Sequence, residues 1–171
     1  MNTTIMEARI APELATRTDL GREEVRAIAE AINPIIADSV ALYIKTKNYH
    51  WHVSGPHFRD MHMLFDEQAA SVLSSVDVLA ERMRKLGATT IRGVAHVARL
   101  AQIVDDEDHY VPTKEMQARL LQDNLAVAKS QRAAIKVCEE NDDKVTGNLL
   151  QEVLDQTERR IWFLYETLQS A

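Results

Sequence analysis

Apolar residues recur along this chain at spacings of three and four, the pattern of helices that bury one face. Four long helices are expected, over roughly residues 22–51, 58–86, 113–141 and 144–168. Thr113 is the expected N-cap of the third. Residues 88–112 form a long connection between the second and third helices, in which the apolar patch 94–104 predicts one small helix. The pattern therefore predicts an all-α protein.

Breaker residues divide the pattern. Pro34 lies inside the first stretch, where it removes one backbone donor, so we expect a kink or a division there. Gly55 and Pro56 close the first hairpin, and Gly87 ends the second helix. Four long helices with a long crossover between the second and third describe a ferritin-like four-helix bundle better than a simple up-down bundle.

Composition favours one compact domain. The chain has 171 residues, of which 46% are hydrophobic, with few glycines and prolines. We expect a flexible N-terminal tail over residues 1–21 and the bundle domain over residues 22–171. No segment reads as a membrane helix or a secretory signal, so a cytoplasmic location without a membrane partner is expected.

Metal-binding side chains form a palindrome in the second stretch, at His62, Asp66, Asp77 and Glu81. Both pairs are centred between residues 71 and 72. On one helix, a step of about 100° per residue places all four side chains within about 100° of each other. At about 1.5 Å per residue, however, Asp66 and Asp77 lie about 16 Å apart along the axis. One helix therefore cannot bring both pairs to one metal ion.

A second copy of the chain can bring the pairs together. If the same helix packs antiparallel across a two-fold axis near residues 71 and 72, each His62 and Asp66 pair meets Asp77 and Glu81 of the partner subunit. Two identical sites result, as an isologous interface requires. The sequence therefore predicts a two-fold dimer.

The apolar stripe of this helix is centred roughly 130° away from the four metal-binding residues. It contains Met61, Phe65, Val72, Val76, Leu79, Met83 and Leu86. The metal-binding side chains thus point away from the core of their own subunit. The alternative is a solvated face with two chance i,i+4 pairs, which are common. The symmetry, and the small and apolar residues Ala70 and Leu73 at its centre, favour the shared site.

His50 ends the first helix, from where it can reach across the hairpin to the metal-binding stripe. The neighbouring Trp51 is either a packing residue or an electron donor near a metal. His52 and His57 are read as surface loop residues in preference to a supporting role at the site. The expected catalytic and metal-binding set is therefore His50 together with the palindrome.

Nitrogen and carboxylate ligands with open positions suit Fe(II), and the same set can also hold Zn(II) or Mn(II). Anionic oxygen ligands favour Fe(III) over Fe(II), because hard ligands prefer the higher charge. Oxidation of bound iron is thereby made easier.

Several motifs around these residues resemble the Dps family of mini-ferritins, also called DNA-binding proteins from starved cells. They are His50-Trp51-His52-Val53-Ser54-Gly55, then His62-x3-Asp66, then Asp77-x3-Glu81-Arg82, with Leu86-Gly87 closing the helix. The likeness spans nearly the whole chain in helix order and length.

This resemblance implies a dodecameric shell that oxidises Fe(II), preferably with hydrogen peroxide, stores the ferric mineral and protects the cell from oxidative stress. It also implies that the ligands matching His50, Asp77 and Glu81 come from one subunit. Those matching His62 and Asp66 then come from its two-fold partner. Trp51 is expected to intercept stray oxidising equivalents.

DNA binding is expected to be weak or absent, although nucleoid association stays open. Phosphate neutralisation by basic residues supplies most nonspecific affinity. The first 22 residues hold no lysine, and their arginines are balanced by acids: Arg9, Arg17 and Arg22 against Glu7, Glu13 and Asp19. The whole chain carries a net charge of −6.

A route for iron through the shell is expected near the start of the fourth helix. Family members tend to line this pore with carboxylates, and two of those positions fall on Lys144 and Asn148 here. Asp142, Asp143 and Glu152 are the candidates to take over, and a solvated acidic helix start is the alternative.

Two other functions compete with the ferroxidase. One is a nucleoid DNA binder whose metal site is secondary. The other is a helical dimer with a structural zinc site, which binds metal stoichiometrically without turnover.

Overall fold

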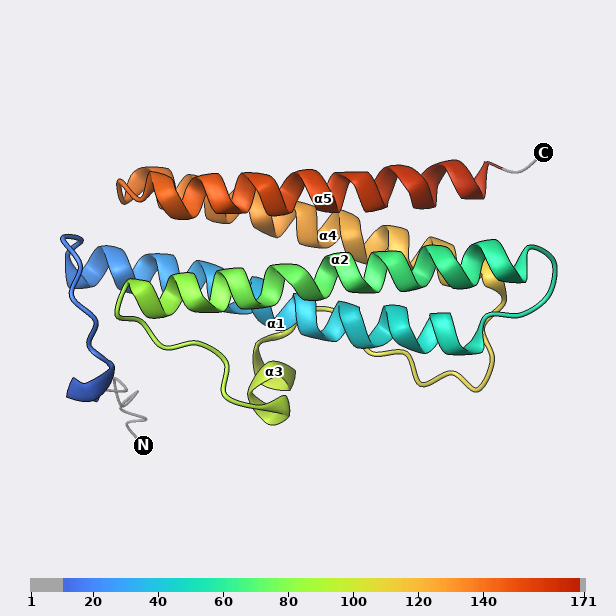
Figure 1. Ribbon diagram of the computed structural model, residues 1–171, viewed down its shortest axis with the longest axis horizontal. Coiled ribbons are helices and arrows are strands. Elements are labelled where there is room, and N and C mark those ends of the chain that lie inside the picture. The colour runs from blue at the N-terminus through green and yellow to red at the C-terminus, as the bar shows by residue number, and fades with distance from the viewer. Residues whose placement is uncertain (1–10, 170–171) are drawn as a thin grey trace, which may run out of the picture.

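The computed structural model describes residues 11–169, whose regular elements are all helical. They are η1 (Pro12–Leu14), α1 (Arg22–His52), α2 (Phe58–Lys85), α3 (Val94–Leu100), α4 (Thr113–Glu140) and α5 (Lys144–Leu168). In Figure 1, α1 and α2 form one hairpin, α4 and α5 form a second, and α3 lies in the crossover between them. The expected ferritin-like bundle with a short helix in its crossover is confirmed.

Helix boundaries follow the sequence pattern with two differences. α1 continues through Pro34, so the expected division does not occur. Ile32 and Ile35, on either side, are fully or almost fully buried, and this packing outweighs the lost backbone donor. The N-cap of α4 is Pro112 rather than Thr113. Thr113 is the first helical residue, and its hydroxyl instead donates to the Ser54 carbonyl at 3.0 Å.

The core consists of two apolar clusters along the bundle. One includes Ile28, Ile32 and Leu150, and the other includes Phe65 and Leu164. Each such side chain contributes about 1.5–3 kcal/mol when it is fully buried. Because the apolar stripe of α2 faces these clusters, the opposite stripe of α2, which bears the palindrome, faces outward.

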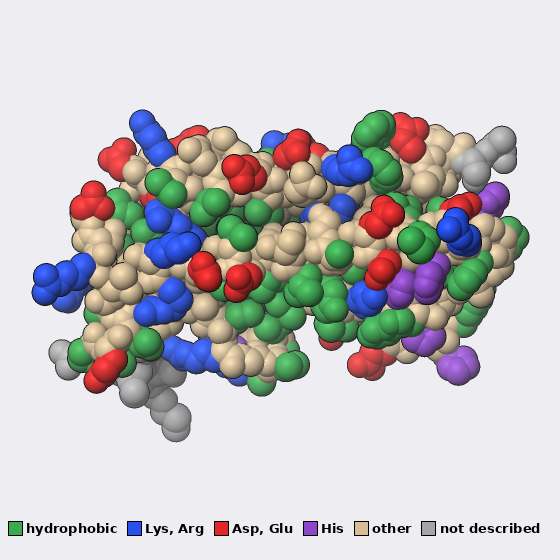
Figure 2. Space-filling view, viewed as in Figure 1, with side chains coloured by type: hydrophobic (Ala, Val, Ile, Leu, Met, Phe, Trp, Pro, Cys, Tyr) green, Lys and Arg blue, Asp and Glu red, His purple; other side chains and the backbone are tan. Residues whose placement is uncertain are grey.

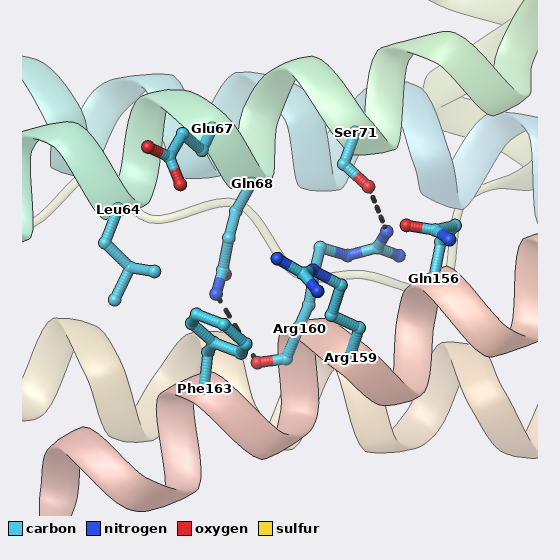
Figure 3. Close-up of a pocket in the computed structure, with 8 residues that line it drawn as sticks. All are labelled: Leu64, Glu67, Gln68, Ser71, Gln156, Arg159, Arg160 and Phe163. Carbon is cyan, nitrogen blue, oxygen red and sulfur yellow. Dashed lines mark hydrogen bonds between the residues drawn. The ribbon is translucent and has the colours of Figure 1, made fainter.

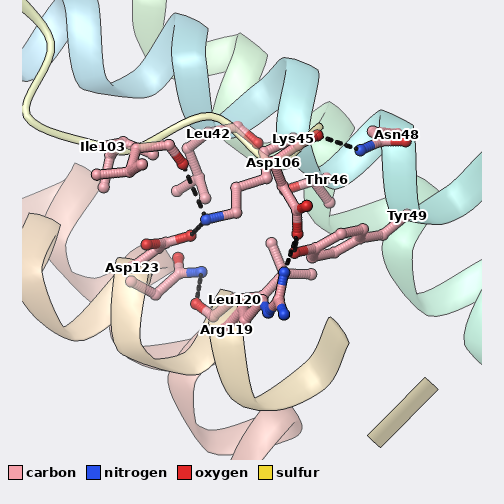
Figure 4. Close-up of polar contacts among 12 residues, drawn as sticks. Leu42, Lys45, Thr46, Asn48, Tyr49, Ile103, Asp106, Arg119, Leu120 and Asp123 are labelled. Carbon is pink, nitrogen blue, oxygen red and sulfur yellow. Dashed lines mark hydrogen bonds and ion pairs between the residues drawn. The ribbon is translucent and has the colours of Figure 1, made fainter. Parts of the chain in front are cut away.

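Buried polar side chains fasten the crossover along α1 (Figure 4). Lys45 donates to the Val104 carbonyl at 3.0 Å and pairs with Asp123 of α4 at 2.8 Å. Asp38, which is also buried, accepts from the backbone N–H groups of residues 102 and 103. Burial raises the pKa of Asp38 although both backbone donors oppose this shift. The long crossover is thereby held against the bundle.

α2 ends at Lys85, and Gly87 lies in the turn that follows, where the sequence predicts the end of the helix. The Gly87 N–H donates to the Arg84 carbonyl at 3.1 Å, and the next N–H reaches Met83 at 3.0 Å. Gly87 has a φ of +79°, and a Cβ there would lie 2.5 Å from the Thr16 carbonyl oxygen. Only glycine fits this turn without strain.

Of the tail expected over residues 1–21, residues 1–10 lie outside the described residues. Residues 12–14 form η1, and the Leu14 carbonyl accepts from Arg84 at 2.8 Å. This part of the tail is therefore joined to the end of α2.

α1 is long and apolar enough to cross a membrane by length and composition alone, contrary to the expectation that no segment has this character. Half of its most apolar window is buried inside the bundle, and the helix packs against α2, α3 and α4. Core packing accounts for these apolar residues.

Candidate metal centre

His50 and His62 lie against each other where α1 ends and α2 begins. Their rings stack with centroids 3.9 Å apart. His50 Nδ1 lies 2.8 Å from the His62 carbonyl oxygen, and His62 Nδ1 lies 2.9 Å from the His50 carbonyl oxygen. A carbonyl only accepts, so each Nδ1 carries the proton in these bonds. In the neutral rings, each Nε2 is left with a lone pair for a metal ion.

Asp66 lies one turn further along α2. Its Oδ1 is 3.9 Å from His50 Nε2, a spacing that one metal ion can bridge with ligand distances of about 2.0–2.2 Å. Lys47 Nζ donates to the same oxygen at 2.7 Å. This hydrogen bond, with the positive charge of Lys47, lowers the pKa of Asp66, so the side chain is a carboxylate at neutral pH.

Lys47 was missed by the reading of the sequence. Its position one turn before His50 on α1 was the available signal, because residues three apart share a helix face. The side chain is mostly buried, and its Nζ lies 5.8 Å from the centre of the Trp51 ring. Lys47 thus places a cation at the carboxylate that a metal ion would bind.

A buried network fixes the last turns of α1, which carry His50 (Figure 4). The Tyr49 hydroxyl donates to the Asp106 carboxylate, and Arg119 of α4 donates to the same carboxylate at 2.7 Å. Burial, together with this hydrogen bond, raises the pKa of Tyr49, so the phenol stays protonated at neutral pH. The network joins Tyr49, the residue before His50, to α4 through Asp106 of the crossover.

Asp77 and Glu81 are exposed on the outer face of α2. Glu81 pairs with Lys85 at 3.3 Å. From His62, Asp77 is about 22 Å along the helix axis at about 1.5 Å per residue. The implied grouping of His50 with Asp77 and Glu81 of its own chain is therefore wrong. His50 lies with His62 and Asp66, because the antiparallel hairpin brings the end of α1 to the start of α2.

Neither half forms a complete metal site within one chain. Within residues 11–169, no group of three or more histidine, cysteine, aspartate or glutamate side chains is placed to hold a metal ion. Between the two halves, α2 exposes Leu73 (45%), whereas the exposed Met63 (45%) and Val78 (43%) are the sequence neighbours of His62 and Asp77. Leu73 is therefore the exposed apolar side chain that a partner helix would cover if it packed across the centre of the palindrome.

The other candidate residues near the hairpin lie at the surface. Figure 2 shows most of the visible histidines gathered at this end of the molecule. Trp51 is 61% exposed, which excludes its reading as a core residue of the single chain. His52 and His57 are exposed, as expected, and His52 Nδ1 is hydrogen-bonded to the Asn48 carbonyl at 2.8 Å.

Asp143 has a structural role at the start of α5. It is the N-cap, accepting from the Thr146 N–H at 3.0 Å and from the Thr146 hydroxyl, and it pairs with Arg82 at 2.8 Å. The side chain is buried, so the expectation that Asp143 lines an iron route does not fit its surroundings. Asp142 and Glu152 are exposed and stay candidates for that route.

Comparison with known proteins identifies the family of this bundle. The sequence matches the ferritin-like domain family over residues 29–171. DNA protection during starvation protein 1 of Deinococcus radiodurans is 30% identical over 145 residues, covering 85% of this chain and 70% of that protein.

Solved structures of similar proteins have the same fold as this chain. DpsC from Streptomyces coelicolor superposes with a TM-score of 0.88 at 28% identity, covering 91% of both chains. The Dps protein of Vibrio cholerae, described as a member of a broad superfamily of ferritin-like diiron-carboxylate proteins, has a TM-score of 0.85 at 25% identity, covering 91% of this chain and 98% of that one. This chain belongs to the Dps family of ferritin-like proteins.

Proposed function

We propose that this protein is a ferroxidase that oxidises Fe(II) to Fe(III) at sites shared across a two-fold subunit interface, and that it stores the ferric product. Membership of the Dps family makes it a mini-ferritin in broad terms. The Vibrio cholerae relative is described as a diiron-carboxylate superfamily member, which supports iron as the substrate.

The observation that carries the proposal is the reciprocal hydrogen bonding of His50 and His62. Both Nδ1 atoms are bonded to backbone carbonyls, at 2.8 and 2.9 Å, and this fixes the tautomer in which Nε2 is the free ligand atom. A histidine held in this way is ready to bind a metal ion without reorientation. Asp66 adds an ionised carboxylate next to His50.

The second half of each site is proposed to be Asp77 and Glu81 of the partner subunit. An antiparallel contact centred near residues 71 and 72 brings these carboxylates to the histidine half and covers the exposed Leu73. Three carboxylates and two imidazoles per site then favour Fe(III), because anionic oxygen ligands stabilise the higher charge. The substrate iron therefore loses an electron more easily at this site than in water.

Hydrogen peroxide is the proposed oxidant. One peroxide accepts one electron from each of two ferrous ions, its O–O bond breaks, and two hydroxide ions result. Because both electrons pass in one site, no hydroxyl radical needs to leave it. Trp51, exposed beside Lys47, is proposed to intercept the oxidising equivalents that do escape.

We further propose that the protein forms a dodecameric shell and that iron enters it past Asp142 and Glu152. A cytoplasmic location and weak or absent DNA binding are also part of the proposal.

The test is anaerobic loading with Fe(II) followed by peroxide, with Fe(III) formation and particle size followed in one sample. Turnover of many irons per chain in a particle of about twelve subunits supports the mini-ferritin function. Stoichiometric binding in a dimer, without turnover, contradicts it and favours the structural zinc alternative.

A further inference from the structure

A small cavity, partly open to solvent and lined by both polar and apolar side chains, lies between α2 and α5 (Figure 3). Its volume is about 70 Å³, several times the roughly 10–15 Å³ that one water molecule requires. The lining residues are Leu64, Glu67, Gln68, Ser71, Gln156, Arg159, Arg160 and Phe163. None of them belongs to the metal-binding set.

Arg160 is the unusual member of this lining, since its side chain is charged but only 6% exposed. Its guanidinium donates to three neutral oxygens at 2.9 Å each: Nε to the Asn124 amide, Nη1 to Ser71 and Nη2 to Thr157. A guanidinium has five N–H groups, so two have no acceptor in this set. Among the ion pairs formed within residues 11–169, none involves Arg160.

A buried charge without a counter-charge is costly for a folded protein. Burial lowers the pKa of Arg160 to about 10, which still leaves the guanidinium protonated at neutral pH. The guanidinium of Arg160 is therefore hydrogen-bonded by neutral side chains, but no described carboxylate neutralises its positive charge.

A second cation lines the same cavity. Arg159 precedes Arg160 on α5, and its guanidinium carbon lies 4.8 Å from the centre of the Phe163 ring. The lining includes one carboxylate, from the exposed Glu67, which offsets one of the two positive charges. The cavity lining therefore keeps a net positive charge, and Arg160 is the more deeply buried of its two cations.

We propose that this cavity binds a small oxyanion of the phosphate class, with Arg160 as its buried anchor. The planar fork of a guanidinium matches the geometry of phosphate oxygens, and such charge-assisted bonds are among the strongest in proteins. Gln68 and Gln156 also line the cavity, and their amides donate one N–H each, to the Arg160 carbonyl and to Asp155, at 3.4 Å in both cases. Each amide has a second N–H that can donate to an anion. An anion here supplies the missing counter-charge.

Ser71 places this cavity at the middle of α2. Its hydroxyl accepts from Arg160, and it is one of the two residues at the centre of the palindrome. An anion bound to Arg160 would thus sit behind the middle of the helix that carries both halves of the candidate metal centre. The anion site itself does not depend on the ferroxidase proposal.

The test uses the full-length, iron-free protein, because ferric iron binds phosphate by itself. Inorganic phosphate is titrated by calorimetry and in thermal unfolding, with chloride at matched ionic strength as the reference. We expect saturable binding and a Tm increase of about 3–6 °C at ten times the Kd. Arg160→Lys keeps the charge but loses the fork, so the Kd rises about tenfold or more.

Two further variants make the test independent of folding defects. Arg159→Gln changes an exposed side chain and is expected to weaken phosphate binding. Arg132→Gln, a control at an exposed arginine paired with Glu158 outside the cavity, is expected to bind like the wild type. The proposal is overturned if phosphate and chloride act alike on the wild type. It is also overturned if Arg159→Gln and Arg160→Lys both retain the wild-type Kd.

Discussion

The imidazoles of His50 and His62 each hydrogen-bond to the backbone carbonyl of the other residue, across the α1–α2 hairpin. Neither ring can rotate without breaking a bond to the other helix, and the stacked rings hold each other in place. The two histidines therefore form one preorganised unit. Preorganised ligands bind without the entropic cost of ordering mobile side chains.

Removal of either histidine should disable this unit. We expect His50→Ala or His62→Ala to weaken Fe(II) binding by about 10–100-fold, because each change removes a ligand and the ring against which the other imidazole stacks. Isothermal titration under anaerobic conditions measures this loss. His52→Ala is the matched control, since His52 is nearby and exposed but bonded only within α1. An equal loss in all three variants would contradict a specific role for the pair.

Lys47 should compete with the metal ion for Asp66. Its Nζ lies 2.7 Å from Asp66 Oδ1, so a bound metal ion must replace this contact. We expect Lys47→Gln to lower the Kd for Fe(II) by up to about fivefold at neutral pH. Because Lys47 lowers the pKa of Asp66, the variant should also lose binding at a higher pH than the wild type as the solution is acidified.

Binding titrations over a pH series measure both effects. Lys129→Gln, at an exposed lysine on α4, provides the control. Weaker iron binding by Lys47→Gln at neutral pH would show that Lys47 supports the site instead of competing for it.

Trp51 should protect against escaping radicals. It is 61% exposed and lies on the turn that carries His50. During peroxide-driven iron oxidation, we expect Trp51→Phe to raise the yield of spin-trapped hydroxyl radical. Trp162→Phe is a matched control, because Trp162 is 59% exposed but lies on α5. If Trp51→Phe gives the same radical yield as the wild type, Trp51 has no such role.

Asp143 should stabilise the fold without taking part in iron transport. Asp143→Ala removes the cap of α5 and leaves Arg82 without its carboxylate partner, so that Arg82 keeps only the Thr146 hydroxyl; we expect a cost of about 3 kcal/mol in the free energy of unfolding. Urea unfolding measures this difference. Asp142→Asn is the control at an exposed neighbour with φ of 56°, a conformation that asparagine tolerates.

The effect of Asp143 on stability should depend on pH. Burial raises the pKa of this carboxyl, but the hydrogen bonds from Thr146 and Arg82 outweigh it, and the net pKa is lowered. Its stabilising contribution is therefore present above the unfolded pKa, about 4, and is lost as the pH falls through the lower folded value. The difference between the wild type and Asp143→Ala should narrow on acidification. A constant difference would contradict the ionised cap.

Much of the fold was predictable because apolar spacing alone determines which helix face is buried. On α2, the predicted stripe contains Phe65, Leu79 and Met83, all fully buried, and the palindrome lies on the outer face. The range predicted for the last helix, 144–168, equals that of α5. These features depend on local periodicity, which a sequence displays directly.

Contacts between distant residues were not predictable in the same way. Periodicity does not reveal that Asp143 pairs with Arg82, or that His50 lies with His62 instead of Asp77. Arg160 was missed because a charged residue is ordinarily exposed, and only the packing of α5 against α2 and α4 shows that it is buried. Such features require the arrangement of whole helices.

The sharing of each site between two chains is the central claim, and complementation tests it most directly. One variant, His50→Ala/His62→Ala, lacks the histidine half. The other, Asp77→Asn/Glu81→Gln, lacks the carboxylate half. Each variant alone should be inactive in Fe(II) oxidation, because both sites of its dimer are broken. The two chains are unfolded together, refolded as an equal mixture, and checked for mixed dimers by native mass spectrometry.

In a mixed dimer, one site combines the altered histidine half of one chain with the altered carboxylate half of the other, and is inactive. The second site combines the two unaltered halves and is intact. Random pairing therefore predicts recovery of about a quarter of the wild-type Fe(II) oxidation rate. If mixed dimers form and the rate stays at the level of the separate variants, the site is not shared between chains and the account is wrong.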